Sequence, residues 1–454
     1  MREDQNVGIN KSLTIEPTIS NARGYRDQSV ADEDLVDVNL FAPTEMLTPG
    51  TIRGDDAIRS AIAVKQSGHI VPVNDAVPSI ISNGYDEAVQ FHLSDDFVIN
   101  AEEDGKVVDV NEELGFVVVE YKSGKTKAIP LKPEIVKNSG AGFYLSNQLT
   151  PVHRKVGEKF KKDEPLAYHD KYFTYSKMNG LRFNIGPLCK VAFCSSYNTY
   201  EDAGICTQRL AERMKSSIVY METGKFKKNH NILSMVNVGD HVNIGDALIK
   251  FDVSVEDNEL AKYLSKLNDS NAALLEEESK SDIKTMHAGK VVAIKVYTIL
   301  PPESLSPSLG AIVKTYFDSA EAKKNYLNKF DNTESTMKAG YLLTDSAEPV
   351  KNRYNSIKGI KGIDVLIEIY IEHEDVMGVG DKVALYGPNK QIVSELIPEG
   401  YEPYSELHPD EEVSVMTSPG TIARRMTASA LKVAATGKIM VELKRKLQNE
   451  IKYK

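Results

Sequence analysis

Tryptophan is absent from this sequence of 454 residues, and cysteine occurs only three times, as Cys189, Cys194 and Cys206. The cysteine spacings fit neither a disulfide framework nor a Cys-x-x-Cys zinc site, which favours an intracellular chain without a structural metal. No apolar run approaches the roughly 18 residues of a membrane span, and the first residues, MREDQNVGINKSLT, lack the apolar core of a signal peptide. These absences predict a soluble globular protein whose length allows about two to four compact units.

Several motifs of nucleotide-binding proteins and hydrolases are also missing. The sequence has no P-loop, no H-E-x-x-H, no G-x-S-x-G and no G-x-G-x-x-G, so the enzymes that depend on them lack their motif here. The net charge of −10 argues against a module that coats nucleic acid by itself. Residues 421–454, however, hold nine Lys or Arg against two Glu. An acidic body with a basic tail is compatible with a local polyanion site.

What the sequence does contain is mainly the pattern of β-strands. Several short runs are rich in β-branched and aromatic residues, and most are bounded by Gly, Asn, Asp or Pro. A sequence echo, V-G-[DE]-x-[VF], occurs near residues 155–168, 237–251 and 378–387, and GKVV occurs at 105–108 and 289–292. Such turns build hairpins in barrel and barrel-sandwich folds. The expected strands are 116–121, 190–194, 290–299, 311–317 and 365–371.

Three segments depart from the strand pattern and predict helices. Residues 254–284 and 318–338 are charged and helix-prone, so we expect solvated helical excursions from a β body. The C-terminal segment has apolar residues at helical spacing with basic residues beside them, which predicts an amphipathic helix whose stripe more often packs than binds a ligand. The stripe consists of Met440, Leu443, Leu447 and Ile451.

Two lysines, Lys382 and Lys390, flank a turn signal at residues 386–389 in GDKVALYGPNK. Taken alone, lysines at the ends of a hairpin are usually solvated surface residues. The alternative is a phosphate clamp, because two mobile ammonium groups on one turn can converge on a single polyanion. The rest of the sequence decides between these interpretations.

Three further stretches carry candidate side chains, each of which is more often a solvated surface group when it occurs alone. One is a predicted helix or turn in residues 54–72, and another is a polar loop that follows the strand near 190–194. The third is SPGTIARRMT, in which Pro-Gly makes a turn and the double Arg is expected to open a helix. Together they supply the cations and paired carboxylates that nucleotidyl transfer requires. The candidates are Arg59, Lys65, Gln66, Glu201, Asp202, Arg424 and Arg425.

Taken in chain order, these stretches resemble the C-terminal half of the β (second-largest) subunit of multisubunit DNA-directed RNA polymerases, over roughly residues 35–430. GDDAIR with the later Val-Pro resembles the stretch that approaches the incoming nucleotide, and its Lys-Gln pair is nearer the archaeal and eukaryotic form. VAFCSSYNTYEDA resembles the strand and loop that end in the family's Glu-Asp pair. VGDKVALYGPNKQIVSELIPE resembles the Gly-Asp-Lys-(x7)-Lys stretch, and SPGTIARRMT the turn before the triphosphate-contacting Arg.

The sequence departs from the bacterial pattern at two candidate positions. Gly68 stands where that pattern has an Arg, and either Lys65 or His69 could replace it. Arg424 matches the family Arg by its distance from Gly420, whereas Arg425 matches by the Met that follows it. The aspartate-rich magnesium loop belongs to the largest subunit and is absent here, as is the N-terminal half of a β subunit. The sequence therefore resembles the split β subunits of polymerases from very large bacteriophages.

The resemblance implies a mainly β (α+β) fold. A double-psi β-barrel would be assembled from discontinuous segments, with a sandwich-barrel hybrid and wall or flap insertions. The ranges would be an N-terminal arm (1–34), barrel segment 1 (35–72), the sandwich-barrel hybrid (73–185), barrel segment 2 with the Glu-Asp loop (186–215), a wall or flap-like region with helical excursions (216–360), barrel segment 3 with the two-lysine loop (361–425) and a basic C-terminal helix (426–454).

The resemblance also implies a catalytic subunit of a nucleotidyltransferase that is inactive alone. Lys382 and Lys390 would hold phosphates of RNA or of the initiating nucleotide. Glu201 and Asp202 would act in catalysis through transient contact with a nucleotide-bound metal, without a permanent ion. Nucleotide or RNA phosphates would be bound by the side chains of Arg59, Lys65, Gln66, Arg424 and Arg425.

Mg²⁺ would be bound mainly by a partner subunit. The expected partners are an N-terminal β-like subunit, β′-like subunits, a promoter-specificity subunit in some assemblies, DNA template, RNA and nucleoside triphosphates, with no membrane. The expected location is the cytoplasm of an infected bacterial cell, with virion packaging left open. A non-enzymatic alternative is a barrel-sandwich protein resembling lipoyl or biotinyl carriers, in which the Asp381-Lys382-Val383 tripeptide would carry the modified lysine.

Overall fold

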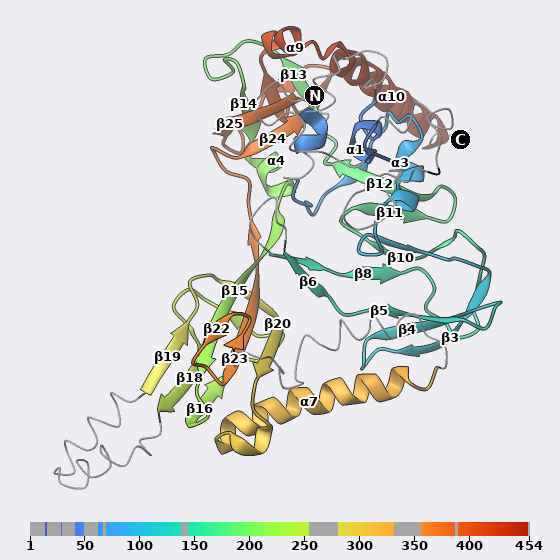
Figure 1. Cartoon of the computed structure of the whole chain (residues 1–454). Helices are drawn as coiled ribbons and strands as arrows, with labels where there is room; N and C mark the ends of the chain where they lie inside the picture. Colours follow the sequence, from blue (N-terminus) through green and yellow to red (C-terminus); the bar gives the residue numbers. More distant parts are fainter. Residues whose placement is uncertain are drawn as a thin grey trace, which may run out of the picture. The chain divides into compact units, whose positions relative to one another are not determined.

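The computed structural model describes two compact units, each built from several chain segments (Figure 1). Taken together, the described residues hold more strand than helix, which confirms the expectation of a mainly β protein. Strands dominate unit 2, whereas unit 1 contains about as much helix as strand. Within the described residues, no helix is long and apolar enough to cross a membrane. Unit 1 comprises Met1–Val98, His169–Ser216 and Asp375–Lys454, and unit 2 comprises Ile99–Tyr168 and Ser217–Glu374. The described residues are 14–15, 29, 41–49, 62–66, 70–137, 144–253, 280–330, 356–385 and 389–452.

Unit 2 contains two groups of sheets. In the first group, strands in the order β5-β4-β3-β9 form one sheet and β2-β10-β8 form another. They enclose an apolar core that includes Val117, Val119 and Phe160. The strand bounds are β2 (Val98–Asn100), β3 (Gly105–Asn111), β4 (Phe116–Tyr121), β5 (Thr126–Pro130), β8 (Leu149–Pro151), β9 (Lys159–Phe160) and β10 (Pro165–His169).

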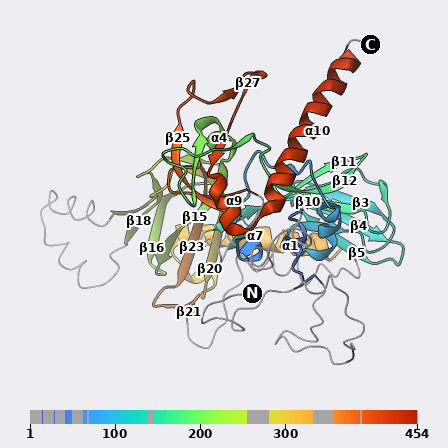
Figure 2. The same ribbon diagram turned by 90° about the horizontal axis from the view of Figure 1, so that it is seen from above.

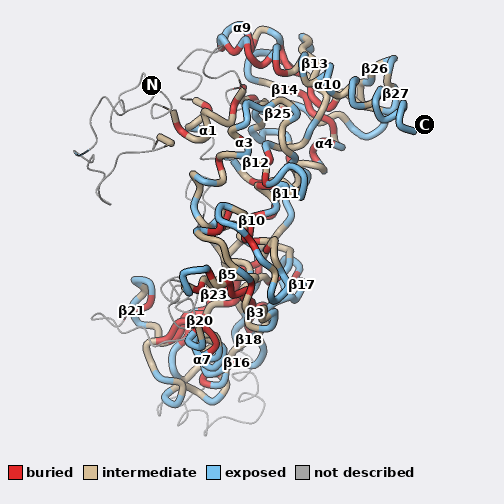
Figure 3. Tube along the Cα trace, turned by 90° about the vertical axis from the view of Figure 1, so that its right-hand side faces the viewer, coloured by how far each residue is buried: buried red, intermediate tan, exposed pale blue. Residues whose placement is uncertain are grey.

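The second group holds the larger core of the unit. Its strands follow the order β17-β20-β23-β15-β7-β6 in one sheet and β16-β18-β19 in another. The buried residues of β20 and β23 are drawn red in Figure 3. The bounds are β6 (Glu134–Lys137), β7 (Tyr144–Asn147), β15 (Ser216–Phe226), β16 (His230–Met235), β17 (His241–Val242), β18 (Ala247–Val253), β19 (Lys280–Lys284), β20 (Gly289–Thr298), β21 (Ser356–Ile357), β22 (Ile360–Lys361) and β23 (Val365–Asp375).

The expected strand at 311–317 is wrong, because these residues lie inside helix α7 (Pro307–Leu327), which follows a short 3-10 helix, η4 (Pro302–Ser304). Ser306 caps α7 by accepting a hydrogen bond from the Leu309 N–H, and a proline occupies the first turn. Leu309 and Val313, four residues apart, are fully buried in the larger core. Capping and packing on one face outweigh the strand propensity of the Ile, Val, Thr, Tyr and Phe in this segment.

Two copies of the sequence echo lie in unit 2, and each belongs to a pair of turns of one construction, which we call acidic turns (155–158 with 161–164, and 237–240 with 243–246). In each, the carboxylate of the fourth residue accepts a hydrogen bond from the N–H of the first, at 2.7 to 3.3 Å. The third residue has positive φ and is Gly in three turns and Asp163 in the other. The left-handed conformation explains the glycines, because other residues adopt it at a cost.

The acidic turns occur in pairs that bracket a two-residue strand, β9 or β17. Each of these strands pairs with the first residues of a GKVV sequence, Gly105 opposite Phe160 and Gly289 opposite Val242. A Cβ atom at Gly105 would lie 2.4 Å from the Glu120 carbonyl oxygen, and one at Gly289 would lie 2.2 Å from that of Glu372. Both positions therefore require glycine for the close approach of the next strand.

The strand pairings extend this match into a duplication of six strands. In the first pair of sheets, β3 lies between β9 and β4, and β10 lies between β2 and β8. In the second pair, β20 lies in the same way between β17 and β23, and β18 lies between β19 and β16. The chain order differs, because β2, β3 and β4 precede β8, β9 and β10, whereas β16, β17 and β18 precede β19, β20 and β23. Unit 2 thus contains the same motif twice, in circularly permuted order.

Unit 1 is organised around a five-stranded sheet in the order β13-β28-β14-β25-β24. β13 runs parallel to β28 and β14 parallel to β25, while β14–β28 and β24–β25 are antiparallel. Its core includes Cys206, Leu210 and Val393. The bounds are β13 (Val191–Phe193), β14 (Ala203–Thr207), β24 (Lys382–Leu385), β25 (Asn389–Ile397), β28 (Val415–Thr417), the hairpin β26 (Tyr404–Ser405) and β27 (His408–Glu412), and helices α4 (Gln208–Arg213), α9 (Pro419–Arg425) and α10 (Ala428–Lys452).

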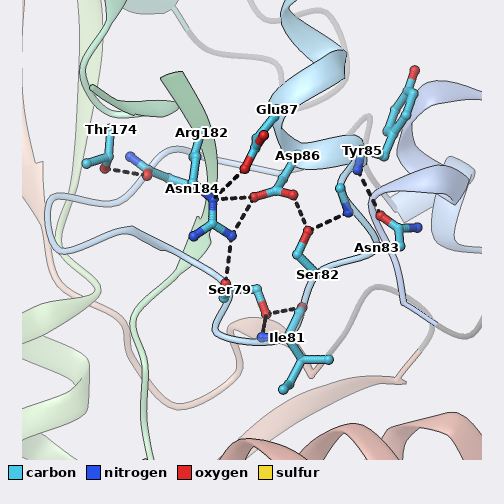
Figure 4. Close-up of polar contacts among 11 residues, drawn as sticks. Ser79, Ile81, Ser82, Asn83, Tyr85, Asp86, Glu87, Thr174, Arg182 and Asn184 are labelled. Atoms are coloured by element: carbon cyan, nitrogen blue, oxygen red, sulfur yellow. Dashed lines mark hydrogen bonds and ion pairs between the residues drawn. The ribbon is translucent and has the colours of Figure 1, made fainter. Parts of the chain in front are cut away.

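A small second sheet in unit 1 is fastened by a buried ion pair (Figure 4). Asp86 accepts a hydrogen bond from Arg182 at 2.7 Å and a second hydrogen bond from Ser82, and Arg182 also donates to the Ser79 carbonyl at 3.1 Å. These contacts tie the segment that follows β1 to strand β12. The elements are α1 (Pro43–Met46), α3 (Tyr85–Ala88), the 3-10 helix η3 (Val89–His92) and the strands β1 (Val77–Pro78), β12 (Gly180–Gly186) and β11 (Phe173–Ser176).

The helical expectations have mixed outcomes. The expected C-terminal helix is confirmed as α10, which ends near the C label in Figure 2, although Met440, Leu443, Leu447 and Ile451 are 42–73% exposed instead of packed. α7 confirms a helix for 318–327, and 331–338 lie outside the described residues. In the range 254–284, only 280–284 are described, and they form strand β19 instead of the expected helix.

Candidate phosphate-binding site

The two candidate lysines lie on one face of the β24–β25 hairpin. Lys382 pairs with Ile392 and Ala384 pairs with Lys390, so these four residues point to the same side of the sheet. Lys382 and Lys390 are therefore diagonal neighbours across the strand pair, roughly 7–8 Å apart at the backbone. Lys382 is exposed and Lys390 is half-buried. The intervening residues 386–388 lie outside the described part of the chain.

An acidic turn at residues 378–381 positions Lys382. The Asp381 carboxylate accepts a hydrogen bond from the Gly378 N–H at 2.8 Å, and Gly380 has a φ of 98°. The turn is tied to β25 because the Gly380 N–H donates to the Val393 carbonyl at 2.8 Å and the Val393 N–H donates to the Asp381 carbonyl at 2.9 Å. The construction is the same as that of the turns in unit 2, and it fixes the first residue of β24.

The Glu201–Asp202 pair lies on the turn immediately before β14. Glu201 has a φ of 53°, an uncommon conformation for a non-glycine residue. The turn is held from both sides, because the Ile392 N–H donates to the Asp202 carbonyl at 2.7 Å and the Thr421 hydroxyl donates to the Glu201 carbonyl. Strand β25 therefore carries Lys390 and also anchors the acidic pair.

The two arginines occupy the last turn of α9, not its beginning, so the expectation that they open a helix is wrong. The helix begins at Pro419, five residues before Arg424, with Ser418 as its N-cap, and Met426 ends it in the left-handed conformation. This placement points the arginines toward the Glu201–Asp202 turn without a contribution from the helix N-terminus.

Arg424 and Arg425 make different contacts. Arg425 is only 9% exposed, forms an ion pair with Asp202 and donates to the Lys390 carbonyl at 2.9 Å. The Arg424 side chain is 55% exposed, pairs with Glu201 at 3.1 Å and lies over the Tyr200 ring at 5.8 Å. Arg425 thus holds the site together, whereas Arg424 presents an accessible guanidinium.

The charges around Lys390 are mostly positive. Partial burial lowers the pKa of the Lys390 ammonium below its ordinary value, and the nearby charges of Lys382 and Arg425 lower it further. Asp202 opposes this effect, and Lys65 adds to it. A cluster of like charges that depresses the pKa of one of its members is stabilised by an anion. An anion beside Lys390 would therefore reduce the repulsion among these cations.

The first predicted segment is only partly described. Lys65 is exposed and Gln66 half-buried in a short helical stretch at residues 62–66, and Lys65 is close enough to Lys390 to affect its pKa. Arg59, Gly68 and His69 lie outside the described residues. The structure thus brings Lys65 to the lysine pair but gives no placement for Arg59.

The acidic pair does not form a metal site by itself. Each carboxylate is engaged by an arginine, and in the described part of the chain no group of three or more His, Cys, Asp or Glu residues could hold a metal ion. Mg²⁺ prefers several oxygen ligands in near-octahedral geometry, which two arginine-paired carboxylates do not supply.

Sequence reasoning missed three residues that shape this site. Asp381 was predicted only as a neighbour of Lys382, although its carboxylate builds the turn before that lysine. Thr421 was passed over, although it fixes the Glu201 carbonyl from 220 residues away in sequence. Tyr200 lies under Arg424, and its position beside the acidic pair was the available signal.

In a comparison with curated proteins, the matching relatives below share the same protein name. The chain is 21% identical over 394 residues to the DNA-directed RNA polymerase subunit beta of Thermus aquaticus, which covers 87% of this chain and 31% of that protein. It is 23% identical over 421 residues to the corresponding subunit of Oenococcus oeni (90% and 31%) and 23% over 429 residues to that of Streptococcus pyogenes (93% and 32%).

The chain is thus similar to the RNA polymerase β subunit along most of its own length. It spans about a third of the length of the curated relatives it matches. No family model matches the sequence.

Proposed function

We propose that this chain is the C-terminal β-like subunit of a multisubunit DNA-directed RNA polymerase, with a nucleotidyltransferase active centre completed by other subunits. The observation that carries the proposal is the cation cluster of Lys65, Lys382, Lys390 and Arg425, which strands and turns from distant segments bring together. The similarity to β subunits along most of the chain supports it.

In this proposal, Lys382 and Lys390 hold phosphates at the growing RNA end or on the initiating nucleotide. Phosphate would relieve the repulsion among the cations that lowers the pKa of Lys390. Arg424 is the better candidate for the triphosphate because its side chain is 55% exposed, whereas Arg425 is occupied by Asp202 and the Lys390 carbonyl. Arg59, Lys65 and Gln66 stay candidates for nucleotide contacts.

Glu201 and Asp202 have two proposed roles. They position the arginines of α9 through the ion pairs described above. Transient contact with a nucleotide-bound metal also remains a prediction for this pair. We assign Mg²⁺ mainly to a β′-like partner, because the carboxylates of the described site are few and already paired.

For the fold, we propose that the five-stranded sheet of unit 1 is part of a double-psi β-barrel. The alternation of parallel and antiparallel pairs among strands from segments 191–207, 382–397 and 415–417 supports this. The duplicated motif of unit 2 supports sandwich-barrel hybrid and wall or flap elements. The expected domain boundaries stay predictions.

The proposed assembly contains an N-terminal β-like subunit, β′-like subunits and, in some forms, a promoter-specificity subunit, acting on DNA template with nucleoside triphosphates to make RNA. A bacteriophage origin, action in the infected cell and virion packaging belong to the same proposal. The carrier alternative is disfavoured, because Lys382 lies at the start of β24 and not at the tip of its hairpin.

Co-purification and reconstitution test this proposal. The tagged chain would be isolated from its native cells, its partners identified by mass, and RNA synthesis measured with template, nucleotides and Mg²⁺. We expect the chain alone to be inert and the assembly to be active, because two-metal chemistry needs more carboxylates than this site offers. Template-dependent synthesis by the isolated chain, or partners unrelated to transcription, would overturn the proposal.

A further inference from the structure

The polar loop between β13 and β14 displays two tyrosines to solvent beside the candidate phosphate-binding site. Tyr197 is 97% exposed and Tyr200 is 74% exposed. In the described part of the chain, no other large apolar side chain is as exposed as Tyr197. The loop ends in the turn of the acidic pair, so Tyr200 is the direct neighbour of Glu201. Two aromatic rings are therefore left in water next to the cation cluster.

The exposure of these rings is not the result of a loose loop, because buried hydrogen bonds fix its backbone. Thr199 is 1% exposed, and its hydroxyl donates to the Cys194 carbonyl at 3.2 Å and accepts a hydrogen bond from the Ser196 N–H at 2.6 Å. The Thr199 N–H donates to the Ser196 carbonyl at 3.3 Å. This bond closes a turn that carries Tyr197 and Asn198 at its tip.

The same loop is attached to strand β25, which carries Lys390. The Asn198 side-chain amide donates to the Glu395 carboxylate at 2.8 Å. The Ser394 hydroxyl donates to the Asn198 carbonyl at 2.7 Å. The loop is thus held at a fixed position relative to the lysine.

Tyr200 joins the loop to the cations of the site. Its carbonyl accepts a hydrogen bond from the Ala203 N–H at 3.2 Å, which closes the turn of the acidic pair. The Arg424 guanidinium lies 5.8 Å from the centre of the Tyr200 ring and pairs with Glu201 at 3.1 Å. Aromatic rings and guanidinium planes both stack on nucleobases. Side chains suited to phosphate and side chains suited to a base therefore lie next to each other here.

We propose that Tyr197 and Tyr200 form a stacking platform for the nucleobase of a nucleotide whose phosphates are held by the cation cluster. This proposal rests on the phosphate-binding role proposed above and adds the recognition of the base. Rings that are already displayed by a fixed loop lose little conformational freedom when a base stacks on them. Every base has a π-face, so the platform accepts all four bases. The base belongs either to a free nucleoside triphosphate or to the end of an RNA strand.

The absence of tryptophan from the chain allows a direct optical test. Tyr197→Trp supplies the sole tryptophan, and its fluorescence in the full chain should be quenched saturably by ATP or by a 5′-phosphorylated tetra-adenylate. Tripolyphosphate carries the charge without the base and should not quench it. Tyr401→Trp is the matched control, because Tyr401 is 80% exposed on another loop of unit 1, and it should show no saturable quenching. Quenching by ATP alone identifies the free nucleotide as the source of the base, and quenching by the tetra-adenylate alone identifies the RNA strand.

Calorimetric titration of further variants at low salt separates stacking from charge. Tyr197→Ala should bind the quenching ligand about tenfold more weakly, and its affinity for tripolyphosphate should not change. A tenfold loss corresponds to about 1.4 kcal/mol, the scale of one base stacked on an aromatic ring. Tyr197→Phe keeps the ring and should bind like the wild type, whereas Tyr197→Leu should not. Tyr200→Ala should act in the same direction as Tyr197→Ala, and thermal unfolding should show that these variants are folded.

The outcomes distinguish this proposal from the phosphate-binding role. If Lys382→Ala weakens the binding of tripolyphosphate and ATP alike, while both tyrosine-to-alanine variants bind like the wild type, the cluster holds phosphate and the stacking platform is wrong. If Lys382→Ala changes no affinity but Tyr197→Ala still weakens ATP or the tetra-adenylate, the platform is confirmed and the phosphate clamp is wrong. No saturable binding of ATP or the tetra-adenylate to the wild type, or equal quenching of Tyr197→Trp by tripolyphosphate, would also overturn the stacking proposal.

Discussion

Replacing Lys382 or Lys390 by alanine tests the phosphate-binding site most directly. A hydrogen bond from a charged group contributes about 1.5–3 kcal/mol, and each 1.4 kcal/mol is a factor of about ten. We therefore expect a loss of about ten- to a hundredfold in RNA initiation or extension from each substitution. The larger loss is expected for Lys390, because it is half-buried whereas Lys382 is exposed.

The environment of Lys390 makes the effects of the two substitutions interdependent. The positive charge of Lys382 contributes to the lowered pKa of Lys390. Removing Lys382 therefore removes part of the repulsion that a bound phosphate would otherwise offset. The two losses, expressed as free energies, should therefore not add up to the loss measured in the double variant. Salt should reduce the effect of the exposed Lys382 more than that of Lys390, since exposed charges are screened beyond about 10 Å at 0.1 M.

The assay is RNA yield from reconstituted polymerase on a defined template, together with subunit assembly measured by gel filtration. Lys314→Ala serves as the control, because Lys314 is an exposed lysine on α7 in the other unit. Lys→Arg at either position should rescue activity only in part, because the guanidinium keeps the charge but not the compact geometry of an ammonium. Wild-type activity in the double alanine variant, with assembly intact, would refute the phosphate clamp.

Three further predictions follow from other parts of the structure. Asp202→Ala should impair RNA extension without affecting subunit assembly, because the largely buried Arg425 loses its carboxylate partner. Unchanged kcat and KM would show that Asp202 is only a surface residue. Gly105→Ala and Gly289→Ala should each lower the unfolding temperature, since the added Cβ would lie within 2.4 Å of a backbone oxygen, whereas Gly437→Ala should not. Burial lowers the pKa of His169 to about 4, against the opposing charge of Asp170. His169 therefore stabilises the chain above about pH 6.5, and this stabilisation, up to about 3 kcal/mol, is lost as the pH falls from 6.5 toward 4; unfolding of His169→Gln should depend less on pH in that window.

Strands that carry a strong local signal could be predicted from the sequence. β4 coincides with the expected run, β13 and β20 differ from theirs by one residue at each end, and β23 extends four residues beyond the expected end. Their β-branched and aromatic residues are bounded by turn residues, so local propensity and the fold agree. The segment 311–317 has the same composition, but Ser306 and Pro307 start a helix there and Leu309 and Val313 bury one face of it.

The contacts of the site could not be read from the sequence, although its residues could be named. Strand β14 pairs with β25 across more than 180 residues of chain, and nothing local specifies that pairing. The different burial of Arg424 and Arg425 follows from where α9 ends, which is set by the left-handed Met426. The internal echo, in contrast, was visible in sequence, but its meaning as a permuted duplication required the strand pairings.

The lysine pair shows why spacing in sequence is not sufficient to define a site. In an antiparallel hairpin, two residues eight apart share a face only when the number of residues between the last paired positions is odd. A loop of four residues at 386–389 would place Lys382 and Lys390 on opposite faces. The pairing of Leu385 with Asn389 leaves three residues between them, so both lysines lie on the same face. The Thr427 hydroxyl donates a hydrogen bond to the Asn389 amide oxygen, and Arg425 donates one to the Lys390 carbonyl. Contacts from α9 and the residue after its C-cap therefore support the register that places Lys390 on this face.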